Sequence, residues 1–476
     1  MARSIPKALA TIKQLDGRVL LQVATIVLFL GWFAIQFAEE RLFSDSSYYL
    51  FHVVNDGRFH IEHGRWVLAL SQLLPLLGTK LGLPLTTLIT LHSLNNVVFL
   101  IAGLLFVLGV LRDHHAALAL ASVQLIGLTH GLFCPIFELY YGVALLIIFR
   151  AVVKDRTLHA YVRWPLLSVL FLGAVSSHFL GMLLTIGSLV MDRCWQDRKL
   201  TILLASVLLV HIVAHTLTLS AYEEKNLHFI QDLGDATKLL GLVGASRLGE
   251  LAHSLIRHYP DITVFGTLTL FVLISKKHWW QVLIFTGILF VLFVLVGLHT
   301  PGFLHDRYRE QLHFAFTAWV IITMCHQVLP LGRYTSLIGI LFGCAVVLRI
   351  AMALDVSRYY AARTAWHRAC IEVARTAHLS KGIIPAPFDF GPADDLVDLS
   401  WSTSVESLLL SASAGPDQTI SLITFLDEEH EDNSAHLDEF IFRRWEIMDT
   451  SALNTVYFRP PTGRYTRIDF PMPRKI

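Results

Sequence analysis

Carboxylates, imidazoles and aromatic rings gather in residues 39–66, which read EERLFSDSSYYLFHVVNDGRFHIEHGRW. Within this stretch, Asp45 lies shortly after an apolar run that ends at Ala38. A carboxylate at this position can remove a proton from an acceptor hydroxyl group, or bind a metal ion that does so. The alternative is a structural role, because Ser44 and Asp45 are residue types that often cap the N-terminus of a helix.

A second polar group follows in the same stretch and consists of Asp56, His60, Glu62 and His63. Its H-x-E-H pattern places groups that can bind metal close together, but the spacing matches no established zinc motif. We expect most of these side chains to form surface hydrogen bonds. A divalent metal ion bound here is the alternative, with its ligands unknown.

Glu138 lies between two apolar runs, in the sequence FCPIFELYYG. A charged side chain at the centre of a membrane helix costs about 2.5–3.5 kcal/mol on insertion scales, so such groups usually face protein or a water-filled cavity. Both a functional role and a structural hydrogen bond are compatible with this position.

Residues 300–311, TPGFLHDRYREQ, place Arg307, Tyr308 and Arg309 immediately before a late apolar run. Guanidinium groups bind phosphate oxygens through paired hydrogen bonds, so this segment predicts a site for a lipid phosphate or diphosphate. The alternatives are an ion pair with Asp306 in a solvated loop, or arginines that extend toward lipid headgroups.

Three histidines inside apolar sequence are weaker candidates. His178 lies at a predicted bend and could contact a substrate, although buried histidines more often make structural hydrogen bonds. His211 and His215 are four residues apart on one predicted helix, but the glutamate of an HExxH motif is missing. We therefore expect these two to pack or to line a cavity.

The elements that must position these groups are membrane helices. Apolar residues make up 54% of the 476 residues and charged residues only 16%, against about 25% in soluble domains. Apolar runs near the ~20 residues that cross a bilayer recur along the chain. They predict an all-α polytopic membrane protein with about eleven transmembrane helices. The candidate spans are 18–38, 84–111, 116–134, 137–153, 164–177, 178–191, 200–219, 261–275, 279–299, 312–329 and 334–355.

Some apolar segments do not fit a simple crossing. The runs 164–177 and 178–191 are short and predict a hairpin of short helices that meet at SSHF, near His178. Residues 66–82 are interrupted by Pro75 and Gly78, so a surface-lying or half-inserted helix is as compatible as a span. The five cysteines show neither pairing nor metal-ligand spacing. No short apolar segment with a cleavage site precedes the first span, which we expect to remain as an anchor.

Basic residues collect in cytoplasmic connectors of membrane proteins. If the spans alternate, one side receives the basic N-terminus and the basic connector residues Arg112, Lys154, Arg156, Arg163, Arg193, Arg198, Lys199, Lys276, Lys277 and Arg333. The opposite side receives residues 39–66, Glu138, His178 and residues 300–311. We expect an integral protein of the bacterial inner membrane with a cytoplasmic N-terminus. Net charge is +1, so the composition does not suggest a nucleic-acid partner.

The composition changes after Asp355. Residues 356–476 contain several prolines, an acidic DEEHED cluster at 427–432 and short runs such as TISLITFL. We predict a transmembrane domain over 1–355 and a small soluble α+β domain over 356–476, on the extracytoplasmic side. A loosely structured tail is the alternative for the second segment.

The order of these features resembles the GT-C superfamily of membrane glycosyltransferases. The stretches that carry the resemblance are SDSSYY with Asp45, the loop that ends GRFHIEHGRW, the turn around Glu138, the short helices at SSHF and HDRYREQ before a late span. Members of this superfamily have many spans, an essential aspartate in the first outer loop and often a soluble C-terminal domain. The C-terminal region here has no WWDYG sequence, which argues against an oligosaccharyltransferase catalytic subunit.

The resemblance implies that a sugar is moved, with inversion, from a polyprenyl-phosphate-linked donor to a lipid, glycan or protein acceptor on the outer face. Asp45 would be the base, Arg307 and Arg309 would neutralise the leaving phosphate, and Tyr308 would lie beside them. Glu138, Glu62 and His63 would position the acceptor or a metal ion, with His178 nearby. The rings of Tyr48, Tyr49 and Trp66 would offer faces for sugar stacking.

Two other classes of function remain open. A glycan polymerase or ligase would also join lipid-linked sugars and would differ by making long products. A transporter or flippase of lipid-linked sugars would use the same polar groups as a pathway through the membrane. The chain shows no internal repeat between its halves, a feature that many transporters have.

Overall fold

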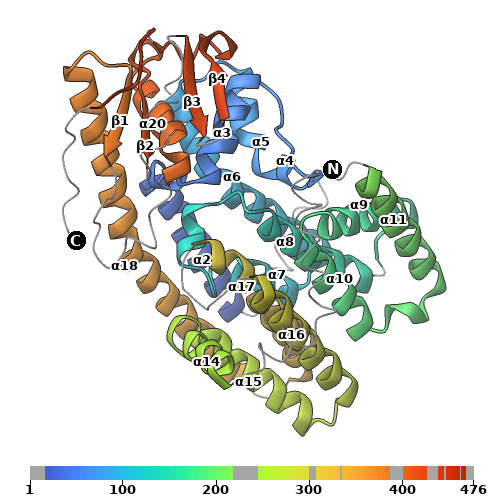
Figure 1. The fold of residues 1–476 in the computed structure, drawn as a ribbon. Helices are drawn as coiled ribbons and strands as arrows, with labels where there is room; N and C mark the ends of the chain where they lie inside the picture. The colour runs from blue at the N-terminus through green and yellow to red at the C-terminus, as the bar shows by residue number, and fades with distance from the viewer. Residues whose placement is uncertain are drawn as a thin grey trace.

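The computed structural model describes residues 17–155, 157–217, 245–299, 307–332, 335–385, 400–425, 438–443, 446–460 and 462–467. Helices dominate these ranges, and strands occur only near the C-terminal end of them (Figure 1). A large apolar core joins the helices of the bundle, and a second core lies between residues 42–91 and the C-terminal region.

The N-terminal half of the bundle is built from α2 (Gly17–Gln36), α6 (Leu85–Leu105) with a π-helical end (Phe106–Leu111), α7 (His114–Ser122), α8 (Glu138–Lys154), α9 (Ala160–Val175), α10 (Phe179–Met191) and α11 (Arg198–Leu217). The later helices are α14 (Ala245–His258), α15 (Pro260–Ser275), α16 (Trp279–His299), α17 (Arg307–Thr323) with a π-helical end (Met324–Val328), and α18 (Thr335–Thr376). Short helices α3 (Asp45–Asp56), α4 (Leu68–Ser71) and α5 (Leu73–Lys80) lie between α2 and α6.

Six helical segments within the described ranges have the length and apolar composition to cross a membrane. They are Gly17–Gln36, Leu85–Leu111, Arg198–Leu217, Trp279–Val296, Glu310–Leu331 and Ser336–Thr376. Three shorter apolar helices accompany them, Ala160–Val175, Phe179–Met191 and Pro260–Ser275. The segments indicate a membrane protein, whereas the expected number of about eleven spans is not confirmed.

The predicted span 116–134 is wrong as a continuous helix. Helix α7 ends at Ser122, and the chain then runs through turns and a short 3-10 helix (His130–Phe133) to Phe137 while remaining buried. Gly127 has a φ of +76°, and a Cβ atom there would lie 2.2 Å from the hydroxyl oxygen of Thr317 in α17. Irregular backbone inside an apolar bundle needs hydrogen-bond partners from the protein. Apolar composition alone could not indicate that such partners exist.

The hairpin of short helices is present. Helix α9 ends at Val175 and α10 begins at Phe179, with His178 in between as the N-cap residue. Its Nδ1 accepts a hydrogen bond of 3.1 Å from the backbone N–H of Leu180. Residues 66–82 form α4 and α5, which contain four and eight residues and are too short to cross a bilayer.

The C-terminal region begins without a break in the helix that precedes it. Helix α18 contains 42 residues and passes through the predicted boundary at 355. It leads to a parallel sheet in the order β2-β1-β5, formed by β1 (Lys381–Pro385), β2 (Ser421–Phe425) and β5 (Thr466–Arg467). An antiparallel pair, β3 (Glu439–Arg443) and β4 (Glu446–Asp449), and helix α20 (Thr403–Ala412) complete the region.

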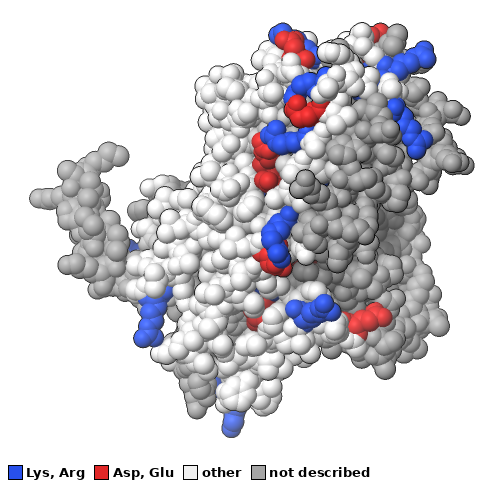
Figure 2. Space-filling view, turned by 90° about the vertical axis from the view of Figure 1, so that its left-hand side faces the viewer, with Lys and Arg blue, Asp and Glu red and all other residues white. Residues whose placement is uncertain are grey.

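Helix α3 packs directly against this C-terminal region (Figure 1). The ring of Phe51 lies 4.7 Å from that of Phe442 and 5.4 Å from that of Phe458. The backbone N–H of Asn454 donates a 2.8 Å hydrogen bond to the side chain of Asn55. Residues 39–66 and the C-terminal region therefore share one end of the molecule. In Figure 2, charged side chains gather toward this upper end, and others are scattered over the mostly uncharged surface below it.

Candidate functional site

The turn that leads into α3 is strained. Ser44 is fully buried and has a φ of +58° with a ψ of −128°, a backbone conformation that residues other than glycine rarely adopt. Such a residue costs about 1–3 kcal/mol and persists only where its surroundings hold it. Its backbone N–H donates a 3.1 Å hydrogen bond to the carboxylate of Glu406 in α20. The Oγ of Ser44 is buried and has no hydrogen-bond partner among the residues that the structure describes.

Glu406 is the centre of a buried ion pair. Two N–H groups of the Arg363 guanidinium, from α18, donate to its carboxylate. The hydroxyl group of Ser402 donates a further bond of 2.5 Å. The turn before Asp45 is thus positioned by the C-terminal region rather than by α2 or α3 alone.

Asp45 is the first residue of α3 and is partly exposed. Ser44, in the N-cap position, makes no side-chain capping bond. Tyr49, one helical turn after Asp45, indicates which other acids lie near this carboxylate. The pKa of Tyr49 is raised well above its ordinary value by burial first, and then by the negative charges of Glu62, Glu138 and Asp45. Three carboxylates from separate segments therefore lie within electrostatic range of one phenol.

Three side chains contact the carboxylate of Glu62. The hydroxyl groups of Tyr48 and Tyr49 donate to it at 2.6 and 3.2 Å, and the Nε2 of His60 lies 3.4 Å away. Burial opposes ionisation of this carboxylate, but the hydrogen bonds from His60 and Tyr48 and the charges of His60 and His63 outweigh it and lower its pKa to about 2. Glu62 is therefore ionised and a weak base.

Glu138 begins α8 and is nearly buried. Its carboxylate forms an ion pair with the guanidinium of Arg65, which joins residues 39–66 to the bundle. Analysis of the sequence did not single out Arg65. A basic partner for Glu138 could have been predicted, because a buried glutamate beside an apolar run requires one.

The aromatic candidates differ in exposure. Tyr48 and Tyr49 are buried, and the guanidinium of Arg443 lies 4.5 Å from the centre of the Tyr48 ring. A sugar could stack on these two rings only after rearrangement. Trp66 is 70% exposed, as sugar stacking requires. His63 lies three residues earlier in the same turn, with a φ of +53°.

His178 is located near the same end of the bundle. Its ring lies 6.0 Å from the ring of Phe137, the residue before Glu138. Because its Nδ1 accepts the capping bond from Leu180, His178 has a structural role at the start of α10. Its predicted contact with a substrate stays a prediction.

The predicted phosphate-binding residues start a helix instead of forming a loop. Arg307, Tyr308 and Arg309 occupy the first turn of α17, and their side chains lie outside the described residues. Further along α17, the ring of Phe314 meets the edge of the Tyr140 ring at 4.7 Å. Tyr140 lies in the first turn of α8, so the beginnings of α17 and α8 share one end of the bundle.

A buried acid that follows Arg309 in the first turn of α17 was not predicted from the sequence. Glu310 is fully buried, and its carboxylate accepts backbone hydrogen bonds from Thr129, His130 and Gly131 at 2.6, 3.0 and 2.8 Å. These bonds satisfy the irregular segment that follows α7. In a continuous helix, these three backbone N–H groups would have donated to carbonyl groups of the preceding turn. Here they donate to the carboxylate of Glu310 instead.

A second buried ion pair adjoins this segment. The guanidinium of Arg349, from α18, binds the carboxylate of Asp261 through hydrogen bonds of 2.6 and 2.5 Å. It also donates to the hydroxyl group of Thr129 at 3.1 Å and to the carbonyl of His258 at 3.0 Å. Arg349 is the single charged residue within the run GILFGCAVVLRIAMAL, which is the signal that could have identified it.

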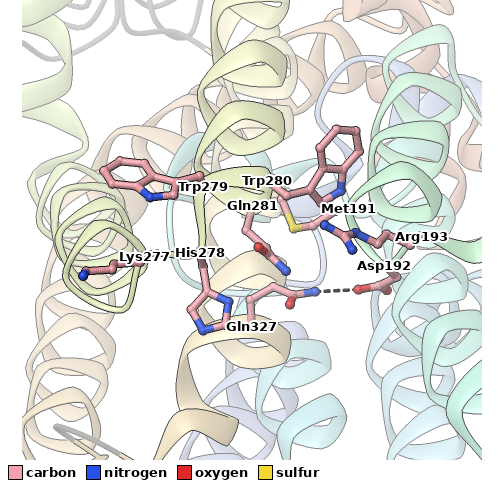
Figure 3. A pocket seen from close by; sticks show the side chains of 9 residues that line it. All are labelled: Met191, Asp192, Arg193, Lys277, His278, Trp279, Trp280, Gln281 and Gln327. Carbon is pink, nitrogen blue, oxygen red and sulfur yellow. Dashed lines mark hydrogen bonds between the residues drawn. The ribbon is translucent and has the colours of Figure 1, made fainter.

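A cavity in the described part of the chain lies away from these residues. It has a volume of about 590 Å³ and is lined by Met191, Asp192, Arg193, Lys277, His278, Trp279, Trp280, Gln281 and Gln327 (Figure 3). Asp192 in its wall accepts a 2.5 Å hydrogen bond from Gln327. Met191 ends α10, whereas His178 at the start of α10 lies near Glu138. The cavity is therefore at the other end of the bundle and contains none of the predicted site residues.

Comparison with known proteins returned no relatives. No protein-family model, curated protein or solved structure matches the chain. The resemblance to the GT-C superfamily therefore stays a prediction from the order of features in the sequence.

Proposed function

We propose that the protein is a membrane glycosyltransferase of the GT-C type. It would transfer a sugar from a polyprenyl-phosphate-linked donor to an acceptor hydroxyl group on the extracytoplasmic face. The observation that carries the proposal is the position of three acids at one end of an apolar bundle. Asp45 lies one turn before Tyr49 in α3, and Glu62 accepts a hydrogen bond from Tyr49. Glu138 is joined to the same stretch through Arg65. Acid groups gathered where a lipid carrier would present its sugar are suited to activating an acceptor.

Asp45 is the carboxylate best suited to act as the base. Glu138 forms an ion pair with Arg65, and Glu62 accepts hydrogen bonds from two tyrosines, so we assign these two acids a positioning role. Asp45 is partly exposed and follows a backbone turn that the C-terminal region holds in place. A positioned base of this kind contributes typically about 10²–10⁴-fold to rate.

In the proposed step, the acceptor O–H group gives its proton to Asp45. The acceptor oxygen forms a bond to the anomeric carbon from the face opposite the phosphate. The bond between that carbon and the phosphate oxygen breaks, and its electron pair leaves with the polyprenyl phosphate. Arg307 and Arg309 would stabilise the charge that develops on this leaving group. Their position in the first turn of α17, whose start shares an end of the bundle with Glu138, supports this role.

The test uses purified protein in vesicles with a panel of polyprenyl-phosphate-linked hexoses that carry a radiolabelled sugar. Transfer of label to an acceptor is measured for the wild type and for Asp45→Asn, which removes the base but keeps the size of the side chain. We expect transfer to fall at least about 100-fold. Full activity of Asp45→Asn would exclude Asp45 as the base.

Asp113→Asn is the matched control. Asp113 caps α7 at the other end of the bundle, where it accepts a 2.9 Å hydrogen bond from the backbone N–H of Ala116. The same chemical change there should leave transfer unchanged. Chromatography of the products separates transfer of a single sugar from polymerisation, because a polymerase or ligase would yield long chains.

A transporter of lipid-linked sugars is the second candidate. The observation that favours it is the buried polar chain formed by Glu310, Thr129, Arg349 and Asp261 within the bundle. Charged groups inside membrane helices often mark transport pathways. Movement of a labelled lipid-linked sugar across protein-containing vesicles, without transfer of its sugar, would support transport and contradict the transferase.

A further inference from the structure

We infer that His52, Asp56 and His60 form a binding site for a divalent transition-metal ion of the zinc type, at the C-terminal end of α3. Each of these residues offers one ligand atom, and the three atoms lie within 4.8 Å of one another. Two of the residues are one helical turn apart on α3, and the third follows the turn at Gly57 that ends this helix. The inference does not depend on the proposed transfer reaction.

The spacing of His52 and Asp56 fits two ligands better than it fits a hydrogen bond. The Nδ1 of His52 lies 3.5 Å from the Oδ2 of Asp56. This separation is long for a hydrogen bond, whose ordinary range ends at about 3.2 Å. Two ligands bound tetrahedrally to Zn²⁺ at about 2.0–2.1 Å lie about 3.3 Å apart. The other nitrogen of His52, Nε2, is buried and has no hydrogen-bond partner within the described part of the chain.

The surroundings of His60 leave one of its nitrogens available to a metal ion. The hydroxyl group of Tyr48 donates to Glu62, so its oxygen can accept from the Nε2–H of His60 at 3.1 Å. A proton on Nε2 leaves the lone pair on Nδ1. Histidines that bind metals are commonly fixed in this way, by a hydrogen bond to a carboxylate or another acceptor on the far side of the ring. Tyr48 and Glu62 therefore prepare His60 to be a ligand.

The ligand set selects the class of ion. Two imidazoles and one carboxylate suit Zn²⁺ and similar ions, whereas Ca²⁺ and Mg²⁺ prefer oxygen ligands alone. Three protein ligands leave a fourth position for water. The rings of His52 and His60 are stacked, with centres 3.9 Å apart and planes 5° apart, so binding requires one ring to rotate toward the ion.

A bound ion would clamp α3 to the chain that follows it. Beside this site, Asn55 contacts Asn454 of the C-terminal region, and the ring of His52 lies 5.3 Å from that of Phe442. The expected consequence is a higher unfolding temperature of the whole protein when the ion is present.

The experiment uses full-length protein without a polyhistidine tag, stripped with a chelator and dialysed against Zn²⁺. Metal content is measured by mass spectrometry, together with the unfolding temperature. We expect one Zn²⁺ per chain and a rise in unfolding temperature. Asp56→Asn, at an exposed position, should weaken binding at least tenfold, as should His52→Gln. Glu62→Gln should weaken it by about 10–100-fold, because it loosens the support of His60.

His211→Gln is the control, because His211 and His215 form another pair of histidines four residues apart, in α11. It should bind Zn²⁺ as the wild type does. The inference is overturned if the wild type takes up no Zn²⁺ at micromolar concentration, if Asp56→Asn and His52→Gln bind it unchanged, or if His211→Gln abolishes binding. A chain that loses Zn²⁺ binding yet retains sugar transfer would leave the role of Asp45 intact.

Discussion

The backbone N–H of Ser44 donates a hydrogen bond to the carboxylate of Glu406, a residue 362 positions later in the chain, at 3.1 Å. This contact joins the turn before Asp45 to α20, and through Arg363 to α18. A catalytic role for Asp45 would therefore depend on a C-terminal region that carries none of the predicted site residues.

Replacing Glu406 by glutamine should destabilise the protein strongly. Both partners in the ion pair are buried, and loss of one charge leaves the Arg363 guanidinium without compensation, which typically costs about 3–5 kcal/mol. Thermal or denaturant unfolding measures the loss. Glu372→Gln is the control, because Glu372 pairs with Arg375 on the exposed side of α18 and should contribute about 0–1 kcal/mol. If the two changes lowered the free energy of unfolding equally, burial would not make the Glu406 ion pair more important for stability than the exposed pair.

Ser44→Gly should stabilise the protein by about 1–2 kcal/mol. Glycine adopts the positive φ of this position without strain, and the change also removes a buried hydroxyl group that has no partner. Ser44→Ala removes the hydroxyl group but keeps the strain, so it should gain less. If strain at Ser44 serves to position Asp45, the glycine variant will lose transfer activity while its unfolding temperature rises. A loss of stability in the glycine variant would contradict this account.

Gly127→Ala should lower the free energy of unfolding by about 1–3 kcal/mol or more, because the new methyl group would collide with Thr317 and the φ of +76° disfavours any side chain. Gly31→Ala provides the comparison. Gly31 lies in α2, and nothing lies within 4 Å of a Cβ atom added there. That change should be neutral or stabilise by about 0.5–1 kcal/mol. Parallel unfolding measurements on the two variants test whether the irregular segment after α7 is as closely packed as described.

Removing one member of the Arg349–Asp261 pair should be worse than removing both. Arg349→Met leaves a buried carboxylate unpaired, at a typical cost of about 3–5 kcal/mol, and Asp261→Asn leaves the guanidinium unpaired. The double variant should recover part of the loss. A double-mutant cycle of unfolding free energies gives the coupling. Additive losses would indicate that the two charges do not interact in the folded protein.

The positions of helices were predicted well where a long apolar run forms one uninterrupted helix. The expected spans 18–38, 137–153 and 279–299 agree with α2, α8 and α16 to within a few residues. The prediction of span 116–134 failed because the segment is apolar throughout, whereas its helix ends at Ser122 and the chain beyond it is irregular and approaches α17 closely at Gly127. The boundary at 355 followed a change in composition, yet no proline or glycine interrupts α18 between Gly343 and Thr376.

For the candidate site, the sequence allowed the individual acidic residues to be predicted but not the residues that contact them. Asp45, Glu62 and Glu138 were recognised by residue type and by their place between apolar runs. Their partners were not, because Arg65 meets Glu138 across 73 positions and Glu406 meets Ser44 across 362. Such pairs depend on tertiary structure, which a pattern within one segment does not encode. Arg349 was overlooked although it is an isolated charge within an apolar run, and Glu310 was overlooked among the charged residues that precede one.

The length of α18 has a mechanical consequence. A straight helix of 42 residues extends about 63 Å at 1.5 Å per residue. Arg349 anchors it within the bundle, and Arg363 anchors it to the C-terminal region. These two anchors are separated by about 21 Å along the helix, so a tilt of about 5° around Arg349 would displace Arg363 by about 2 Å. A tilt of α18 within the bundle would thus be transmitted through Arg363 and Glu406 to the turn before Asp45.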